Sequence, residues 1–307
     1  MTTTQCTLPL PPGFRVADIL KFHQRDSLAF AERVEAGTLT KGMVWQGQPA
    51  CLTVDFQAQQ SLVKISLESE LTAPRRKYPW GVTNAQTLAT HVARMLGLSQ
   101  PVEAFEAQHR QHPQLGPLLA RQSGLRVPLA ATPFEALTWA ITGQQISVGA
   151  AVAMRRKLIK AAGMVHSSGI ACYPDAERLA ALSEADLRNA GFSASKAQTL
   201  ITVSTKVLNG ELPLDEWQAE LPVEQISERL LAIRGIGPWT VNYTLLRGFG
   251  WLDGSLHGDA AIRRSLQALL NSPDKISEAA AQRWLAEFSP WRALIAAHLW
   301  ASLSLAA

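Results

Sequence analysis

A glycine-rich turn and a carboxylate lie close together near the C-terminus, within Leu230–Asp259. Gly235 and Gly237 interrupt the run LLAIRGIGPWT, and Pro238 suits the first turn of a following helix, where no backbone donor is needed. Free N–H groups at such a helix start, together with the helix dipole, favour an anion such as phosphate. A plain helix–helix turn with a terminal glycine accounts for the same residues, so both interpretations stay open here.

The carboxylate is Asp259, which precedes AAIRRSLQALL and is therefore expected at the start of a helix. One interpretation is an N-cap whose oxygens accept backbone N–H groups. The other is a catalytic carboxylate in a cleft beside the turn, kept ionised with help from the helix dipole. Such a group stabilises positive charge on a deoxyribose ring, which is the chemistry of cutting a base from its sugar. The two interpretations are compatible.

Aromatic side chains occur near both features. Trp239 and Tyr243 are four residues apart and would share one helix face, while Trp291 and Trp300 belong to the last helical segment. Most of the nine tryptophans must fill the core. The alternative is an aromatic cleft that stacks on an extruded, electron-poor base, because ring faces attract cations.

A glutamine pair lies between two helical runs in Gly143–Ser147, GQQIS. Such a pair is often only solvated, but it also suits the gap left when a base leaves duplex DNA. His257 and His298 are isolated, and no HxxxH or HExxH spacing occurs, so we do not expect a zinc site.

The elements that position these residues follow from the hydrophobic pattern. Up to about residue 73 we expect a helix within Arg15–Glu35 and two strands, Ala50–Phe56 and Ser61–Leu67, joined by a turn at Gln57–Gln60. Pro74–Gly81 marks a boundary, and from about residue 83 the pattern is helical nearly to the end. The prediction is a small α/β domain followed by a larger all-helical region.

Several helix boundaries in this region are marked by capping residues and glycines. They are Thr132 as the cap of a helix from Pro133, Ser183 with Asp186 as a capping-box variant, Gly191 as a stop, Ser193 or Ser195 as the cap of Lys196–Leu208, and Val223–Ile233 as an amphipathic helix.

Composition narrows the class of protein. Hydrophobic residues make up 47% and charged residues 18%, which fits a globular protein. A net charge of +4 permits a nucleic-acid partner without requiring one. Cys6, Cys51 and Cys172 are far apart, which argues against an iron–sulfur cluster or disulfide framework and favours the cytoplasm. We see no long apolar run or secretory signal, so no membrane contact is expected.

In this order, the residues resemble the helix-hairpin-helix (HhH-GPD) DNA glycosylase superfamily, and within it the bacterial 3-methyladenine DNA glycosylases of type II, which repair alkylated DNA. The likeness is strong over Pro133–Ile159, with FEALTWAITGQQISVGAA, and over Leu230–Trp300, and weak over residues 1–110. It implies an α+β fold with an N-terminal antiparallel-sheet domain over residues 1–80. The all-helical glycosylase region, residues 81–307, would hold the catalytic cleft between two lobes.

The resemblance also implies a role for each candidate. Asp259 matches the family's catalytic aspartate, and Trp239 stands where strand-cleaving members carry a Schiff-base lysine, so we expect a monofunctional enzyme. The other expected site residues are Trp239, Tyr243, Trp300 and Phe22 in the base pocket, Gln145 as the intercalating residue, Gly235, Gly237, Trp239 and Thr240 in a phosphate-binding hairpin, and the main-chain carbonyls of Leu231, Ile233 and Ile236 around a structural sodium or potassium ion.

The expected activity is hydrolysis of the N-glycosidic bond of alkylated bases, of the 3-methyladenine and 7-methylguanine type, in double-stranded DNA. An abasic site would remain, no cofactor would be required for the chemistry, and the enzyme would act as a monomer on the nucleoid. Ala260 and Gln145 depart from an enterobacterial relative, which has an aromatic and an apolar residue there, so the lesion range stays open. The alternatives are a glycosylase for deaminated or oxidised bases and a non-catalytic DNA-structure-binding protein.

Overall fold

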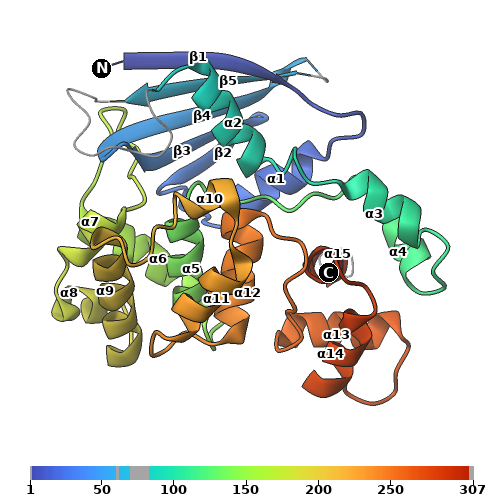
Figure 1. Cartoon of the computed structure of the whole chain (residues 1–307). Helices are drawn as coiled ribbons and strands as arrows, with labels where there is room; N and C mark the ends of the chain where they lie inside the picture. Colours follow the sequence, from blue (N-terminus) through green and yellow to red (C-terminus); the bar gives the residue numbers. More distant parts are fainter. Residues whose placement is uncertain (1, 60–61, 70–82, 304–307) are drawn as a thin grey trace.

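The computed structural model describes residues 2–59, 62–69 and 83–303 of the chain. Its first part is a five-stranded antiparallel sheet with the strand order β1-β5-β4-β3-β2 (Figure 1). This confirms the predicted sheet. The elements are β1 (Thr2–Pro9), α1 (Val16–His23), β2 (Glu32–Glu35), β3 (Thr38–Trp45), β4 (Gln48–Gln59) and β5 (Leu62–Ser69).

Both predicted strands are present, and both extend further than the sequence indicated. Ala50–Phe56 lies within β4, and most of Ser61–Leu67 lies within β5. The predicted hairpin is confirmed by the antiparallel pairing of β4 and β5, but its turn does not begin at Gln57, because β4 runs to Gln59, which pairs with Leu62. Residues 60–61 lie outside the described residues, as does the predicted boundary at Pro74–Gly81.

The helix predicted within Arg15–Glu35 is confirmed as α1, which ends at His23, and Glu32–Glu35 at the end of that range forms β2. The chain turns between them, where Asp26 Oδ1 accepts the N–H of Leu28 at 3.1 Å. Ala29 adopts a positive φ of 48°, which ends any helical path.

The helix α2 (Ala85–Met95) lies across one face of the sheet (Figure 1). Its Leu88, Val92 and Met95 are buried in one cluster with Leu52 and Ile65 of the sheet. The sheet therefore obtains its apolar cover from a segment beyond residue 80, and a domain boundary at that residue stays a prediction.

From residue 83 the described chain is helical, as predicted. The remaining helices are α3 (Val102–His109), α4 (Leu115–Arg121), α5 (Pro133–Gly143), α6 (Val148–Ala162), α7 (Ala176–Ala180), α8 (Glu184–Asn189), α9 (Ala194–Leu208), α10 (Trp217–Glu220), α11 (Val223–Leu231), α12 (Pro238–Thr244), the π-helical turn η1 (Leu245–Phe249), α13 (Ala260–Leu269), α14 (Glu278–Ala286) and α15 (Arg292–Leu303).

The predicted caps are confirmed. Thr132 Oγ1 accepts the N–H of Glu135 at 3.0 Å, and Ser183 forms a capping box at the start of α8. Of the two serines considered for α9, Ser193 is the cap. The helix predicted to end at Ile233 ends at Leu231, because the chain already turns at the next residues.

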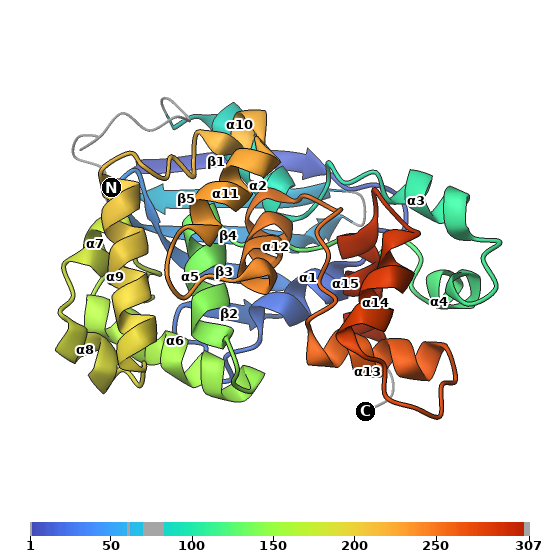
Figure 2. The same ribbon diagram turned by 60° about the horizontal axis from the view of Figure 1, so that its bottom comes forward.

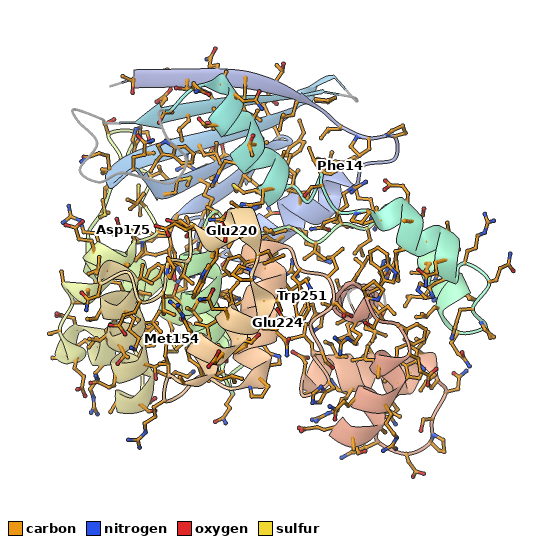
Figure 3. The ribbon with its side chains drawn as sticks, in the orientation of Figure 1. Phe14, Met154, Asp175, Glu220, Glu224 and Trp251 are labelled. Carbon is orange, nitrogen blue, oxygen red and sulfur yellow. The ribbon has the colours of Figure 1, made fainter. Side chains whose placement is uncertain are left out.

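Two apolar clusters divide the helices into two lobes, which lie beside each other below the sheet (Figures 1 and 2). One lobe comprises α6 to α11, and the other α3, α4 and α13 to α15. Among the side chains in Figure 3, Met154 of α6 and Trp251 pack against the first cluster. The helix α12 contributes to both, since Val241 belongs to the first cluster and Tyr243 to the second.

No helix among the residues that the structure describes has the length and hydropathy needed to span a membrane.

Candidate active site

Asp259 caps α13 and gathers four hydrogen-bond donors. Its Oδ1 accepts the backbone N–H groups of Ala261 and Ile262 at 2.8 and 3.0 Å. Trp300 Nε1 lies 3.3 Å from the same oxygen, and Trp239 Nε1 lies 3.1 Å from Oδ2. These donors and the positive end of the helix stabilise negative charge at this position. Because Oδ2 has one donor and Oδ1 three, Oδ2 keeps room for a further partner.

Three of the predicted aromatic residues, Trp239, Tyr243 and Trp300, form one group beside this carboxylate, whereas Trp291 donates to Gln108 Oε1 instead. Tyr243 stacks on Trp239 with ring centroids 5.1 Å apart, and its centroid lies 6.1 Å from that of Trp300. A fourth aromatic, Trp139 of α5, donates its Nε1–H to Tyr243 Oη at 2.9 Å. Trp139 is not among the site residues predicted from the sequence. These rings come from α5, α12 and α15, so the group lies where the two lobes meet.

Phe22, at the end of α1, reaches this aromatic group through two arginines. The Arg247 Cζ lies 4.7 Å from the Phe22 ring centroid and 5.7 Å from that of Trp300. The Arg25 Cζ lies 4.0 Å from the Phe22 centroid and 4.7 Å from that of Trp139. The N-terminal domain thus supplies one wall of the site, as the placement of Phe22 in the base pocket implied.

Arg247 is held in place by a backbone carbonyl. Arg247 Nη1 donates to the carbonyl of Pro128 at 2.8 Å. Burial lowers the pKa of Arg247 to about 10; Tyr243 opposes this change, and the charge of Arg25 adds to it. A buried cation therefore already stands against the aromatic wall.

A small cavity lies among these side chains. Phe22, Arg25, Trp139, Tyr243 and Arg247 contribute to its lining, and its volume is about 10 Å³. That volume is about what one water molecule needs. This cavity is too small for a flat ring, which could enter it only if one of the lining side chains moves.

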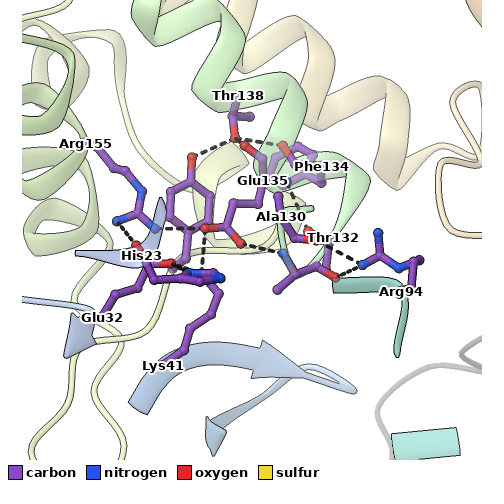
Figure 4. A network of polar contacts seen from close by, with 12 residues as sticks. His23, Glu32, Lys41, Arg94, Ala130, Thr132, Phe134, Glu135, Thr138 and Arg155 are labelled. Atoms are coloured by element: carbon purple, nitrogen blue, oxygen red, sulfur yellow. Dashed lines mark hydrogen bonds and ion pairs between the residues drawn. The ribbon is translucent and has the colours of Figure 1, made fainter. Parts of the chain in front are cut away.

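Buried charges at the cavity join the N-terminal domain to the helices (Figure 4). Lys41 Nζ donates to Glu32 Oε1 at 2.7 Å and to Glu135 Oε1 at 2.8 Å. Arg155 lies 2.8 Å from Glu135 and 3.3 Å from Glu32. Burial raises the pKa of both carboxyls, but the charges of Lys41 and Arg155 outweigh it, so both pKa values lie below the usual range.

This network also positions the pocket wall. His23 directly follows Phe22, and its Nδ1 lies 2.8 Å from Glu32 Oε1. The last turn of α1 is thereby fixed to β2, β3 and α5, which carry Glu32, Lys41 and Glu135. The orientation of Phe22 thus depends on charged contacts of Glu32 and Glu135, which line the same cavity.

The two glycines of the predicted hairpin have different roles. Gly235 adopts a positive φ of 92°, and a Cβ there would lie 2.4 Å from Thr199 Oγ1. Thr199 donates that hydroxyl to the Arg234 carbonyl at 3.0 Å, so it is held in place. Gly237 precedes α12, and a Cβ there would meet nothing within 4 Å. Gly235 is thus required by the fold, whereas Gly237 leaves a backbone surface open.

The loop with the glutamine pair lies against this hairpin. Gln144 Nε2 donates to the carbonyl of Gly235 and to Thr240 Oγ1, both at 2.9 Å. Thr240 is buried, so its side chain supports the loop from inside. Gln145 itself is exposed and adopts a positive φ of 57°. The bridging role of Gln144 is a second feature that the sequence analysis missed.

The loop also presents apolar surface. Ile146 and Val148 follow Gln145 and are 38% and 64% exposed, which is unusual for β-branched apolar side chains. Lys196 Nζ holds the base of the loop by donating to the carbonyls of Thr142 and Gln144 at 2.9 and 2.8 Å. A rigidly held loop therefore projects Gln145 with apolar neighbours.

The carbonyls expected to hold a cation lie where α11 ends. The Ile233 carbonyl accepts the N–H of Ile236 at 3.0 Å. Within the part of the chain that the structure describes, no backbone N–H outside helices donates to the carbonyls of Leu231 and Ile236. The negative end of a helix dipole with free carbonyls fits a monovalent cation.

Two family models match this chain. The model of the HhH-GPD superfamily base excision DNA repair proteins matches residues 138–290, and the AlkA N-terminal domain model matches residues 5–132. Together they cover nearly all of the sheet, the hairpin, Asp259 and the aromatic group except Trp300.

Individual relatives agree with the family models. DNA-3-methyladenine glycosylase 2 of Escherichia coli strain K12 is 33% identical over 190 residues, which cover 61% of this chain and 63% of that protein. The DNA-3-methyladenine glycosylase of Bacillus subtilis strain 168 is 25% identical over 218 residues, or 70% of this chain and 72% of that protein. The match thus spans less than two thirds of the first relative's length.

A solved structure has the same fold over nearly the whole chain. The 3-methyladenine DNA glycosylase of Archaeoglobus fulgidus superposes with a TM-score of 0.78 at 21% identity, covering 96% of this chain and 97% of that one. Fold and family models agree over both the sheet and the helical lobes. The chain belongs to the HhH-GPD superfamily of base excision DNA repair proteins.

Proposed function

We propose that this protein is a monofunctional DNA glycosylase that excises alkylated bases from double-stranded DNA as a monomer and leaves abasic sites. The observation that carries the proposal is the placement of Asp259, whose carboxylate adjoins an aromatic group through Trp239 and Trp300. The relatives named as 3-methyladenine glycosylases support the substrate class. A structure of the Schizosaccharomyces pombe 3-methyladenine DNA glycosylase with abasic DNA, 26% identical with a TM-score of 0.56 and covering 64% of this chain and 94% of that one, supports DNA as the partner.

Binding would begin at the hairpin and the glutamine loop. The open backbone at Gly237 and the start of α12 would contact a phosphate near the lesion, where free N–H groups favour an anion. Gln145, held by the Gln144 contacts, would fill the stack as the damaged nucleotide rotates out. Its exposed neighbour Ile146 adds apolar area to this wedge.

The chemistry would centre on Asp259. An N3- or N7-alkylated purine is cationic in DNA, so the glycosidic electron pair leaves with the base, which departs neutral, and positive charge develops on the sugar. The free side of Asp259 Oδ2 would stabilise that charge and orient the attacking water. Water then bonds to the sugar carbon and its proton is released, which gives the free base and an abasic site. The carbonyls of Leu231, Ile233 and Ile236 would bind a sodium or potassium ion that stiffens the hairpin without joining the reaction.

Strand cleavage is not expected, because Trp239 carries no amine that can form a Schiff base. Incubation with alkylated duplex should therefore give abasic sites in strands that stay intact until alkali is added. Borohydride should trap no covalent protein–DNA adduct. A borohydride-trapped adduct, or strand breaks before alkali treatment, would show a lyase and overturn the monofunctional assignment.

The hairpin glycines offer a matched pair of substitutions. Gly235→Ala should lower the free energy of unfolding by about 1–3 kcal/mol, because it adds a Cβ at a positive φ and forces Thr199 aside. Gly237→Ala should leave stability nearly unchanged but weaken duplex binding, because the new methyl group occupies the open backbone surface. Urea unfolding and fluorescence anisotropy with a duplex check the two effects. If Gly237→Ala leaves duplex binding unchanged, this surface does not contact a DNA phosphate.

A further inference from the structure

Guanidinium groups and aromatic rings alternate along one wall of the pocket. In order, Trp300, Arg247, Phe22, Arg25 and Trp139 are neighbours, each Cζ lying between 4.0 and 5.7 Å from the ring centroids beside it. These ring faces are the surfaces on which a planar base would stack. The arginines therefore occupy places that a base needs.

Arg25 is the more easily displaced of the two. It follows the end of α1 in a turn and, like Arg247, is half-buried. Among the described residues, no carboxylate or carbonyl bonds to its guanidinium, which is held by the two rings alone. Arg247, in contrast, is tied to the Pro128 carbonyl. The cavity that Phe22, Arg25 and Trp139 help to line has a volume of only about 10 Å³, so movement of Arg25 would make room for a base at this wall.

Arg25 and Arg247 make this wall of the pocket positively charged, which affects the bases that can bind there. The nearby carboxylates Glu32 and Glu135 are already paired with Lys41 and Arg155, so they do not neutralise Arg25 or Arg247. A cationic base would meet two like charges there. A neutral base with a ring nitrogen and a keto oxygen offers acceptors that a guanidinium binds in a bidentate manner.

We propose that Arg25 is a specificity-determining residue, which fills the stacking place between Phe22 and Trp139 in the empty pocket and, once displaced, favours neutral keto-bearing purines over cationic ones. The inference rests on the proposed base excision. Cationic alkylated purines remain substrates because their glycosidic bonds are weak. Arg25 shifts the relative rates and does not decide alone whether a base is released.

Hypoxanthine and 7-methylguanine provide a neutral and a cationic purine for this comparison. Both carry the same keto oxygen, but in DNA only the second is cationic and lacks a free N7 acceptor. Single-turnover release should be measured from duplexes that contain one of each. Arg25→Met should raise the ratio of the 7-methylguanine rate to the hypoxanthine rate by about tenfold. Arg25→Lys, which keeps the charge, should leave that ratio closer to the wild-type value than Arg25→Met does.

The matched control is Arg121→Met, which removes the same charge from an exposed position on α4. It should leave the ratio at the wild-type value. If Arg25→Met also leaves the ratio within about threefold of wild type, Arg25 does not set base selection and the inference is overturned.

A binding measurement separates this inference from the proposed function. The nucleosides 7-methylguanosine, a cation, and inosine, which is neutral, can be titrated against tryptophan fluorescence without any turnover. Arg25→Met should shift their affinity ratio toward 7-methylguanosine. If the wild type releases no base but the shift occurs, the proposed function fails and the role of Arg25 stands. If the wild type releases bases but Arg25→Met changes neither the ratio of release rates nor the ratio of nucleoside affinities, the proposed function stands and the role of Arg25 is overturned.

Discussion

Asp259→Asn is expected to reduce the rate of base release by a factor of about 100 to 1000, with duplex binding nearly unchanged. Asparagine is a good N-cap, so the Ala261 and Ile262 contacts and the start of α13 should survive. The negative charge that stabilises the sugar is lost. The new amide also places either a donor or a neutral oxygen toward the indole N–H of Trp239.

Single-turnover release from methylated duplex measures this loss, and anisotropy with the same duplex measures binding. The matched control is Asp274→Asn, an exposed carboxylate in the loop between α13 and α14, which should retain the wild-type rate. A release rate within a few-fold of wild type for Asp259→Asn would exclude Asp259 as the catalytic group.

Lys41→Met is expected to lower the free energy of unfolding by about 3–5 kcal/mol, the largest stability effect proposed for this protein. The Lys41 side chain is 1% exposed and joins Glu32 of β2 to Glu135 of α5. Methionine retains much of its volume but removes the ammonium. Two buried carboxylates would then share Arg155 as their remaining full cation in this network.

Urea unfolding measures the loss, and Lys157→Met on the exposed face of α6 is the control, expected to change stability by no more than about 0.5 kcal/mol. The double variant Lys41→Met with Glu135→Gln should recover part of the loss, because it restores the charge balance. A loss of less than about 1 kcal/mol for Lys41→Met would mean that the network contributes little to joining the domain and helices.

The catalytic candidate was accessible from sequence because its signals are local. Asp259 precedes an amphipathic helix, and Trp239 follows two glycines at a fixed distance, so short-range geometry places both. Trp300 lies 41 residues from Asp259 in the chain, and its role came from the order of motifs shared with the family. The structure brings all three together through hydrogen bonds.

Other features depend on contacts that no local pattern encodes. Lys41 lies in a strand, where a charged residue indicates an exposed edge, yet it is buried because Glu135 approaches from 94 residues away. Arg25 and Arg247 are ordinary surface residues by type, and only the packing of Phe22 between them reveals their place in the pocket.

Three strands of the N-terminal domain were also missed in the prediction from sequence. The strands β1, β2 and β3 were not predicted because their patterns combine threonines, charges and a glycine. Gly42 in β3 is needed because a Cβ there would lie 2.1 Å from the Ala171 carbonyl oxygen. The close approach of the segment after α6 therefore requires glycine at this position. Because glycine is unfavourable within strands, the local sequence pattern predicts a strand there only weakly.

The central claim, excision of alkylated bases centred on Asp259, is tested most directly by mass spectrometry of the bases released from methylated duplex DNA. The wild-type protein should release free 3-methyladenine and 7-methylguanine, with one abasic site for each base and the strands intact. Asp259→Asn should release almost none under the same conditions. No free base from the wild type, despite tight binding to a duplex with an abasic-site analogue, would contradict the claim and indicate a non-catalytic DNA-binding protein.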